Sequence, residues 1–301
     1  MVLFISFLHS CEKGDVEKNE PYDKSVSAIA VHENTIWVGT HKHGLYMFDG
    51  ESWTSYTYKD GLLSDTISSL AVSSDGCLWI GTNMGLSKFE NETWTDFTTD
   101  DGLYNNKIYS LACDQHENIW IGTRSNRVVK FDGADFTPYS IFIPGNPEGR
   151  GHIHTIACDL EGNVWVGSCY TGLSKFDGVT WTHDILNLNG FVNSSMCTKS
   201  GDVWIGHISG AYLLSGGVWT NYTTEDGLID KLVRCFTVDS QDNIWIGTYK
   251  GLSKFNGTSW TSYTTTNGLS DNIISALACD INGDIWVGSF AGGLMKLINT
   301  K

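Results

Sequence analysis

Histidine residues with metal-ligand spacing are the first candidates for chemistry in this chain. Two His-x-His pairs occur, His41 with His43 and His152 with His154. A zinc site needs three or four ligands at about 2 Å from a single ion, and the two pairs lie far apart in the sequence. We therefore expect these histidines to line a polar pocket or to sit in solvated loops, and we expect no metal.

The eight cysteines follow a packing pattern instead of a ligand or disulfide pattern. Val72 and Val238 stand seven residues before a recurrent tryptophan, and cysteine takes the same position in other repeats. The cysteines at this position are Cys113, Cys158, Cys197 and Cys279. No Cys-x-x-Cys motif occurs. This pattern predicts small core residues on separate strands.

Acidic turns precede the same tryptophans, with the sequences DQHEN, DLEGN, DSQDN and DINGD. Calcium binding is one interpretation, but the turns are short and lack alternating Asp or Asn ligands with a terminal Glu. Asp and Asn also bond to their own backbone and tolerate left-handed conformations. We therefore expect turn chemistry here, with no cofactor.

All these features belong to one repeat that occurs seven times. The sequence IWVGT at 36–40 has near-copies at 78–82, 119–123, 164–168, 203–207, 244–248 and 285–289. The clearest unit contains four short strand-like runs, ISSLAV, CLWIGT, GLSKF and TWTDF, separated by turns that contain Gly, Asn or Asp. Four antiparallel strands at a period near 41 residues predict an all-β fold, a seven-bladed β-propeller of four-stranded blades.

Tryptophan packing explains why the motif recurs. We expect each motif Trp to bury about 150–250 Å² between blades, and the following Gly to allow close blade packing or a bend. The other tryptophans fall on the predicted fourth strands, at Trp53, Trp94, Trp181, Trp219 and Trp260. Together these positions use all 12 tryptophans. None remains as an obvious platform for a sugar ring.

The N-terminus has two interpretations. Residues 1–11, MVLFISFLHSC, resemble a truncated bacterial lipoprotein signal with Cys11 as the lipidated residue, followed by a polar linker at 12–25 and the propeller at 26–301. This interpretation predicts a periplasmic or outer-membrane lipoprotein. The chain also stops soon after GGLMKL at 292–297, before a fourth strand of the last blade. Residues 2–8 are therefore also candidates for the closing strand; otherwise the last blade has three strands.

The net charge excludes two classes of partner. It is −15 with a pI near 4.8, which argues against nucleic acid and anionic membrane surfaces, because both attract clustered Lys and Arg. No apolar run is long enough for a membrane-spanning helix. We expect membrane contact only through a lipid anchor.

Variation between the repeats points to one face of the propeller, which we call the top face. The loops from second to third strand and from fourth strand to the next blade share this face, because the strands alternate in direction. Arg and Tyr there suit a glycan or a small anionic ligand, whereas ordinary drift of exposed loops is the alternative. The candidate ligand-binding residues are Tyr109, Arg124, His154, Tyr170, Asn193, His207, Arg234, Tyr249 and Phe290.

The repeat unit, with its D-G-L, W-(I/V)-G-T and G-L-x-x-F elements, resembles the two-component-regulator propeller repeat over residues 26–297. In that family, propellers form the periplasmic sensor part of bacterial hybrid histidine kinases and often sense glycan fragments. The resemblance implies a ligand-binding sensor propeller without enzymatic activity. We expect a stand-alone single propeller, since no immunoglobulin-like domain, transmembrane helix or kinase accompanies it.

Two other functions stay open. A protein-interaction scaffold would show an apolar or charged patch on its rim instead of a ligand-sized pocket. A lyase or hydrolase similar to the streptogramin lyases would need a general acid and base close together. His152, His154 and His207 are candidates for these roles, with Glu148 as a partner.

Overall fold

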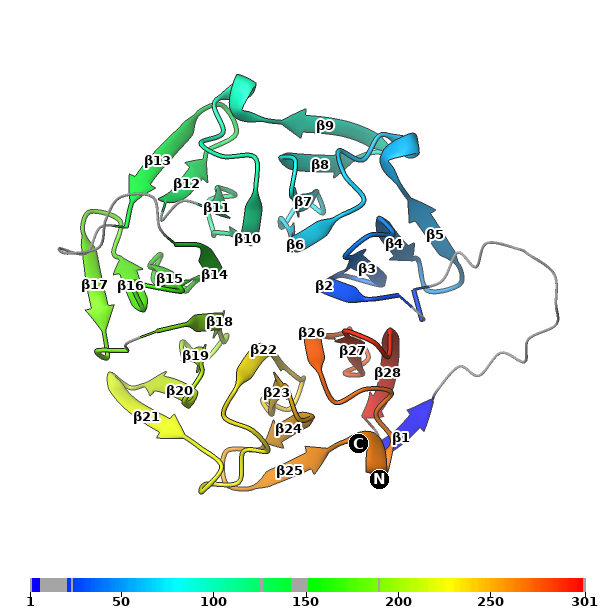
Figure 1. Cartoon of the computed structure of the whole chain (residues 1–301), viewed down its shortest axis with the longest axis vertical. Helices are drawn as coiled ribbons and strands as arrows, with labels where there is room; N and C mark the ends of the chain where they lie inside the picture. Colours follow the sequence, from blue (N-terminus) through cyan, green and yellow to red (C-terminus); the bar gives the residue numbers. More distant parts are fainter. Residues whose placement is uncertain are drawn as a thin grey trace.

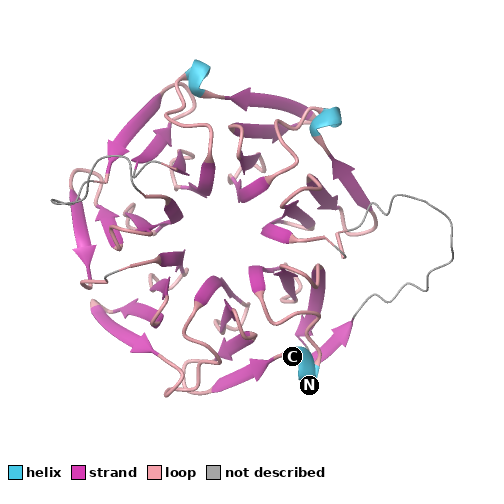
Figure 2. Cartoon of the chain, in the orientation of Figure 1, coloured by secondary structure: helices cyan, strands magenta, loops and turns pink. Residues whose placement is uncertain are grey.

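The computed structural model describes residues 2–5, 21–22, 24–124, 127–141, 151–188 and 190–299. Seven antiparallel sheets of four strands each stand as blades around a central axis (Figure 1). Within the described residues the only helices are three short 3-10 turns, η1, η2 and η3 (Figure 2). They span Tyr58–Asp60, Thr99–Asp101 and Thr265–Asn267. The predicted seven-bladed propeller is confirmed.

Each blade begins at the axis. The first strands lie innermost: β2 (Val26–His32), β6 (Ile67–Val72), β10 (Ile108–Cys113), β14 (Ile153–Cys158), β18 (Val192–Cys197), β22 (Val233–Val238) and β26 (Ile274–Cys279). The second strands carry the tryptophan motif: β3 (Thr35–Thr40), β7 (Leu78–Thr82), β11 (Ile119–Thr123), β15 (Val164–Ser168), β19 (Val203–His207), β23 (Ile244–Thr248) and β27 (Ile285–Ser289).

The outer half of each blade is completed by two more strands. The third strands are β4 (Leu45–Phe48), β8 (Leu86–Glu90), β12 (Arg127–Phe131), β16 (Leu173–Phe176), β20 (Gly210–Ser215), β24 (Leu252–Phe255) and β28 (Leu294–Asn299). The outermost strands are β5 (Trp53–Tyr56), β9 (Thr93–Phe97), β13 (Phe136–Ser140), β17 (Trp181–Ile185), β21 (Val218–Tyr222), β25 (Trp260–Tyr263) and β1 (Val2–Ile5).

The seventh blade takes three strands from the end of the chain and its outermost strand from the beginning. β1 pairs antiparallel with β28, with Val2 opposite Asn299. This is the closing-strand alternative for the N-terminus. Cys11, on which the lipoprotein interpretation depends, lies outside the described residues, as does the linker from 12 to 20. The linker's end is anchored, because Tyr22 Oη accepts a hydrogen bond of 3.2 Å from Trp53 Nε1.

The glycine of the tryptophan motif sets the distance between blades. The seven motif tryptophans are 0–7% exposed. A Cβ atom on Gly81 would lie 2.6 Å from Cγ2 of Ile108, which starts the first strand of the next blade. At Gly39 the same atom would lie 2.5 Å from Cγ2 of Ile67. Of the two roles expected for this glycine, close packing between blades is therefore the one that the structure supports.

A second recurrent device joins the blades. In the first connector, Thr57 and Asp60 form a reciprocal capping box around η1. Gly61 then turns the chain at φ 107°, and Leu62 inserts between blades at 2% exposure. Equivalent boxes flank η2 and η3. The D-G-L element of the repeat is thus a turn followed by a leucine that is buried between two blades.

Gly81→Ala should destabilise the fold by about 1–3 kcal/mol, because the added methyl group overpacks the boundary against Ile108. Urea denaturation of the variant measures this change. Ile108→Ala alone should cost about 2–5 kcal/mol through a cavity. The double variant should lose clearly less than the sum of the two, since the added methyl group fills part of that cavity. If the double variant lost the sum of the two single losses in unfolding free energy, the contact with Ile108 would not be the reason for a glycine at position 81.

Candidate functional site

A ring of seven side chains surrounds the axis at the top of the first strands. In every blade the pairing between first and second strand shifts by one residue, which leaves the second residue of the first strand out of the ladder. Such bulges re-aim side chains near functional sites. The seven bulge residues, all half-buried, are Ser27, Ser68, Tyr109, His154, Asn193, Arg234 and Ser275.

Some residues of the bulge ring hydrogen-bond to the next blade, whereas others contact aromatic rings or cations. Ser68 Oγ donates to the carbonyl of Ile108 in the next blade at 2.7 Å, and Ser275 Oγ donates to Val26 in the same way at 2.7 Å. Asn193 Nδ2 makes a similar bond of 3.3 Å to the Val233 carbonyl. Asn193 thus helps to hold neighbouring blades together. The other large bulge residues, in blades 3, 4 and 6, have ring or cation contacts.

Tyr109 and His154 belong to an aromatic group at blades 3 to 5. The ring of Tyr109 stacks on His152 at 4.8 Å and lies 6.1 Å from His154. His154 in turn lies 6.1 Å from Phe191, and His152 Nδ1 donates to the carbonyl of Arg124 at 3.1 Å. Neither Phe191 nor the stacking of His152 was predicted from the sequence.

Partial burial of the His154 imidazole favours its neutral form. Burial lowers the pKa of His154, and the charge of a protonated His152 lowers it further. His154 Nε2 is buried and has no hydrogen-bond partner among the described residues. The aromatic group therefore presents an unpaired ring nitrogen.

Arg234 and Tyr249 form a second group, at blade 6. The Arg234 guanidinium lies 4.7 Å from the centre of the Tyr249 ring, within cation–π range. Arg234 Nε is buried without a hydrogen-bond partner in the part of the chain that the structure describes. Phe290 pairs with His41 at 5.9 Å. Burial lowers the pKa of His41, with smaller contributions from the positive charges of Arg234 and Lys42.

The remaining predicted residues do not join these groups. Tyr170 is 62% exposed, and Arg124 is exposed except for the backbone carbonyl that binds His152. The site candidates thus divide into two groups in different blades, with Tyr170 and the Arg124 side chain on the open surface.

His207 acts in a turn. It replaces the Thr or Ser that ends the other second strands, and it is 5% exposed. Its Nδ1 accepts the backbone N–H of Ser209 at 3.2 Å, as Thr82 Oγ1 accepts that of Met84 at 3.0 Å. Burial lowers the pKa of His207. The position of His207 in the repeat already indicated this role in the turn, because Thr, Ser and His can all accept a backbone hydrogen bond there.

The acidic turns on the opposite, bottom face are occupied by protein donors. Asp239 Oδ2 accepts the indole N–H of Trp245 at 2.9 Å and the Asn243 amide at 2.8 Å. The same Asp-to-Trp bond, at 2.9–3.0 Å and six residues apart, recurs from Asp114, Asp159 and Asp280. These carboxylates hydrogen-bond to the tryptophan of the motif. This role explains why the turns are acidic. The constant Asp–Trp spacing was visible in the sequence.

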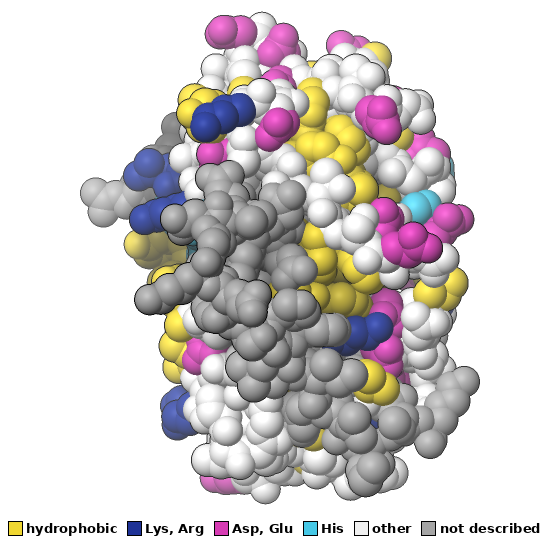
Figure 3. Space-filling view, turned by 90° about the vertical axis from the view of Figure 1, so that its right-hand side faces the viewer, with side chains coloured by type: hydrophobic (Ala, Val, Ile, Leu, Met, Phe, Trp, Pro, Cys, Tyr) yellow, Lys and Arg dark blue, Asp and Glu magenta, His cyan; other side chains and the backbone are white. Residues whose placement is uncertain are grey.

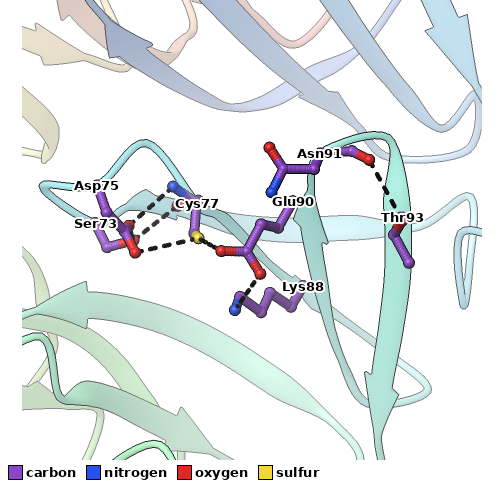
Figure 4. A network of polar contacts seen from close by, with 7 residues as sticks. All are labelled: Ser73, Asp75, Cys77, Lys88, Glu90, Asn91 and Thr93. Atoms are coloured by element: carbon purple, nitrogen blue, oxygen red, sulfur yellow. Dashed lines mark hydrogen bonds and ion pairs between the residues drawn. The ribbon is translucent and has the colours of Figure 1, made fainter.

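In the described residues, one cluster has donors that could surround a metal ion. Ligand atoms of Asp75, Cys77 and Glu90 lie within 4.8 Å of one another. Figure 4 shows that this cluster is bonded internally: the Cys77 thiol lies 2.8 Å from Glu90 Oε1, and Lys88 Nζ pairs with Glu90 Oε2 at 2.8 Å. Burial and the two carboxylates raise the pKa of Cys77 to about 12. The sulfur therefore keeps its proton and acts as a hydrogen-bond donor.

The cysteines of the first strands are inert for the same reason. Cys113, Cys158, Cys197 and Cys279 pack against the inter-blade cores. Burial, as the largest cause, raises the pKa of Cys113 and Cys197 to about 12 and that of Cys279 to about 11. All seven described cysteines are free thiols. Their expected role as small packing residues is confirmed.

Comparison with known proteins finds a family similarity in four segments of the chain. The family model of the two component regulator propeller matches residues 61–84, 103–125, 227–250 and 268–291. These four segments are similar to two-component-regulator propeller repeats. Each matched segment runs from a D-G-L connector, or its close equivalent, to just past the next W-x-G motif. A search of curated proteins finds no match.

Several solved structures are similar to this chain in fold. Extracellular domains of two hybrid two-component systems from B. thetaiotaomicron are 21% and 22% identical, with TM-scores of 0.74 and 0.77. They cover 91% and 94% of this chain, which spans 38% and 40% of theirs. Virginiamycin B lyase from Staphylococcus aureus is 14% identical with a TM-score of 0.76, covering 92% of this chain and 96% of the lyase. No helix in the described residues is long and apolar enough to cross a membrane.

His207→Thr should make the stability of the propeller less dependent on pH. A lowered pKa in the folded state means that the unfolded chain binds the proton more readily. Stability from neutral His207 is therefore present above the unfolded pKa of about 6.5 and is lost as the pH falls below it. Threonine restores the hydroxyl used in other blades. Thermal melts between about pH 7.5 and 5 should show a shallower fall in Tm; an unchanged slope would contradict the buried neutral form.

Proposed function

We propose that this propeller is a ligand-binding sensor module that recognises a glycan or small anionic molecule at the centre of its top face. The observation that carries the proposal is the Arg234 guanidinium, held against Tyr249 with a buried Nε that has no hydrogen-bond partner among the described residues. An unsatisfied buried donor is costly. A carboxylate, sulfate or phosphate group of a ligand would supply the missing acceptor in a charge-assisted bond.

Aromatic side chains on the same face support a sugar-like ligand. Tyr170, Tyr249 and Phe290 are 62%, 43% and 54% exposed. Exposed rings on one face offer apolar platforms against which a sugar ring can stack, and Tyr109 with His154 adds polar edges on the other side of the axis. The proposed ligand is therefore amphipathic, with an anionic group for Arg234.

The proposal also includes the cellular location of the propeller. The extracellular domains similar in fold belong to hybrid two-component systems, and an extracytoplasmic position, in the periplasm or on the outer membrane, suits a module that samples ligands from outside. Lipidation at Cys11 would anchor it there; in that case residues 1–10 are a signal, and blade 7 keeps its three strands from the end of the chain. A second protein would then have to carry the signal onward.

Arg234→Gln tests the placement of the ligand. Calorimetric titration with a uronic-acid oligosaccharide and its neutral counterpart should show preference for the acidic sugar. The variant should weaken that binding about tenfold or more, as expected for a lost charged hydrogen bond. Arg127→Gln is the matched control, because Arg127 also lies over a tyrosine ring, that of Tyr104 at 4.5 Å. Equal losses in both variants, or no preference for the acidic sugar, would refute this site.

A lyase is the second candidate function. The fold matches virginiamycin B lyase over nearly the whole length of both chains, and the neutral His154 beside His152 could act as a general base. Glu148, the acidic partner expected from the sequence, lies outside the described residues. Incubation with quinupristin, which one lyase structure contains, followed by chromatography, tests this. Turnover that disappears in a folded His154→Ala variant would establish the lyase.

A further inference from the structure

The bottom face carries a concentrated negative charge. It is formed by the turns between first and second strands and between third and fourth strands. Every blade contributes at least one carboxylate to these turns, and Lys199 is the one Lys or Arg within them in the described chain. Figure 3 shows the molecule from the side, with many Asp and Glu side chains along its right-hand edge. This face therefore favours a cationic partner.

A groove opens in this face between blades 7 and 1, and we call it the 7–1 groove. Its volume is about 510 Å³, and its floor contains Trp286 and Phe48. The corresponding groove between blades 5 and 6, where Trp204 and Phe255 hold the same positions, has a volume of about 130 Å³. The repeat thus provides a matched comparison, in which one junction is open and the other is nearly filled.

The length of one turn accounts for much of the difference. In blade 1 only Glu33 and Asn34 separate β2 from β3. In blade 6 the equivalent turn spans residues 239–243, and its Asp242 reaches the smaller groove. The short turn of blade 1 leaves the wall of the 7–1 groove low. The volume of the 7–1 groove falls in the range typical of ligand pockets.

The lining combines acidic walls with an apolar floor. Glu33, Asp49, Glu51 and Asp280 line the groove. Among the described residues that line the groove, the only cation is Lys296, which already pairs with Asp280 at 3.1 Å and with Asp284 at 2.9 Å. Within the part of the chain that the structure describes, the carboxylates on the blade 1 side therefore have no cation of their own in the groove.

An apolar contact is available at the lip of the groove. Ile281, in the blade 7 turn, is 67% exposed. The groove is also lined by Ile36 and Trp286, which are both 2% exposed. A side chain that entered between the acidic walls would therefore exchange water for apolar contact, while a neighbouring cation met the carboxylates.

We propose that the 7–1 groove binds an extended peptide segment of a partner protein that alternates Lys or Arg with apolar residues. The cations pair with Glu33, Asp49 and Glu51, and an apolar side chain lies on the floor beside Ile281. Alternation fits because successive side chains of an extended segment point to opposite sides. This site is on the opposite face from the proposed ligand site and does not depend on it.

The test uses the whole chain and two labelled heptapeptides. One has lysine at every second position with leucine or phenylalanine between, and the other has serine between. Fluorescence anisotropy at about 0.15 M salt suppresses long-range attraction. The apolar peptide should bind about tenfold more tightly than the serine peptide, and Ile281→Ser should remove most of that advantage. Equal binding of the two peptides, or no binding of either, overturns the proposal.

Charge variants separate the groove from the rest of the acidic face. The triple variant Glu33→Gln, Asp49→Asn and Glu51→Gln should weaken binding about tenfold. Asn is tolerated at position 49, since Asn256 caps the equivalent turn of blade 6 by accepting the N–H of Ser259 at 2.8 Å.

A second triple variant on the same face is the matched control. It carries Asp132→Asn, Asp135→Asn and Asp177→Asn, which remove the same charge from blades 3 and 4, and it should change binding less than about twofold. Similar losses in the two triple variants would mean diffuse attraction to the whole bottom face, and the groove assignment would be wrong. Melting curves of both variants verify that the fold is intact.

Discussion

The approach of one blade to the next, at the glycine of the second strand, is the constraint on which the rest of the structure depends. In each blade this glycine faces a β-branched residue that starts the next first strand, and a Cβ atom would overlap it. A closed ring needs the same spacing at every junction, so the glycine and its tryptophan recur in all seven blades. Asp–indole bonds from the acidic turns then fix the tryptophan ring in four of the blades.

This constraint leaves particular positions free to vary. The bulge on each first strand removes one residue from the ladder, directly after the β-branched residue that packs on the glycine. Its side chain can therefore change from serine to tyrosine, histidine or arginine without disturbing the contact between blades. The ring of bulge residues concentrates variation at the axis, where side chains from several blades can act on one ligand.

The sequence was sufficient for the fold because period, strand length and tryptophan spacing all agree on one architecture. It also located the top face, since alternation of strand direction decides which loops lie together. It could not decide between a signal and a closing strand at residues 2–8, because a short apolar run suits both. Side-chain partnerships were also out of reach: the cation–π pair joins Arg234 of β22 to Tyr249 in the loop after β23, and only the fold brings them to 4.7 Å.

The two faces differ because the two kinds of turn have different tasks. Bottom turns are short hairpins, and Asp or Asn caps their backbone: Asp177 Oδ1 accepts the N–H of Thr180 at 2.7 Å. These bonds hold the pKa of Asp177 below its usual range, so the carboxylate stays charged. The charged Asp residues that cap these turns thus also give the bottom face a negative electrostatic potential. An anion is repelled from that face and meets Arg234 only from the top. The same field favours a cationic partner below, so one structural device would separate the two proposed kinds of binding.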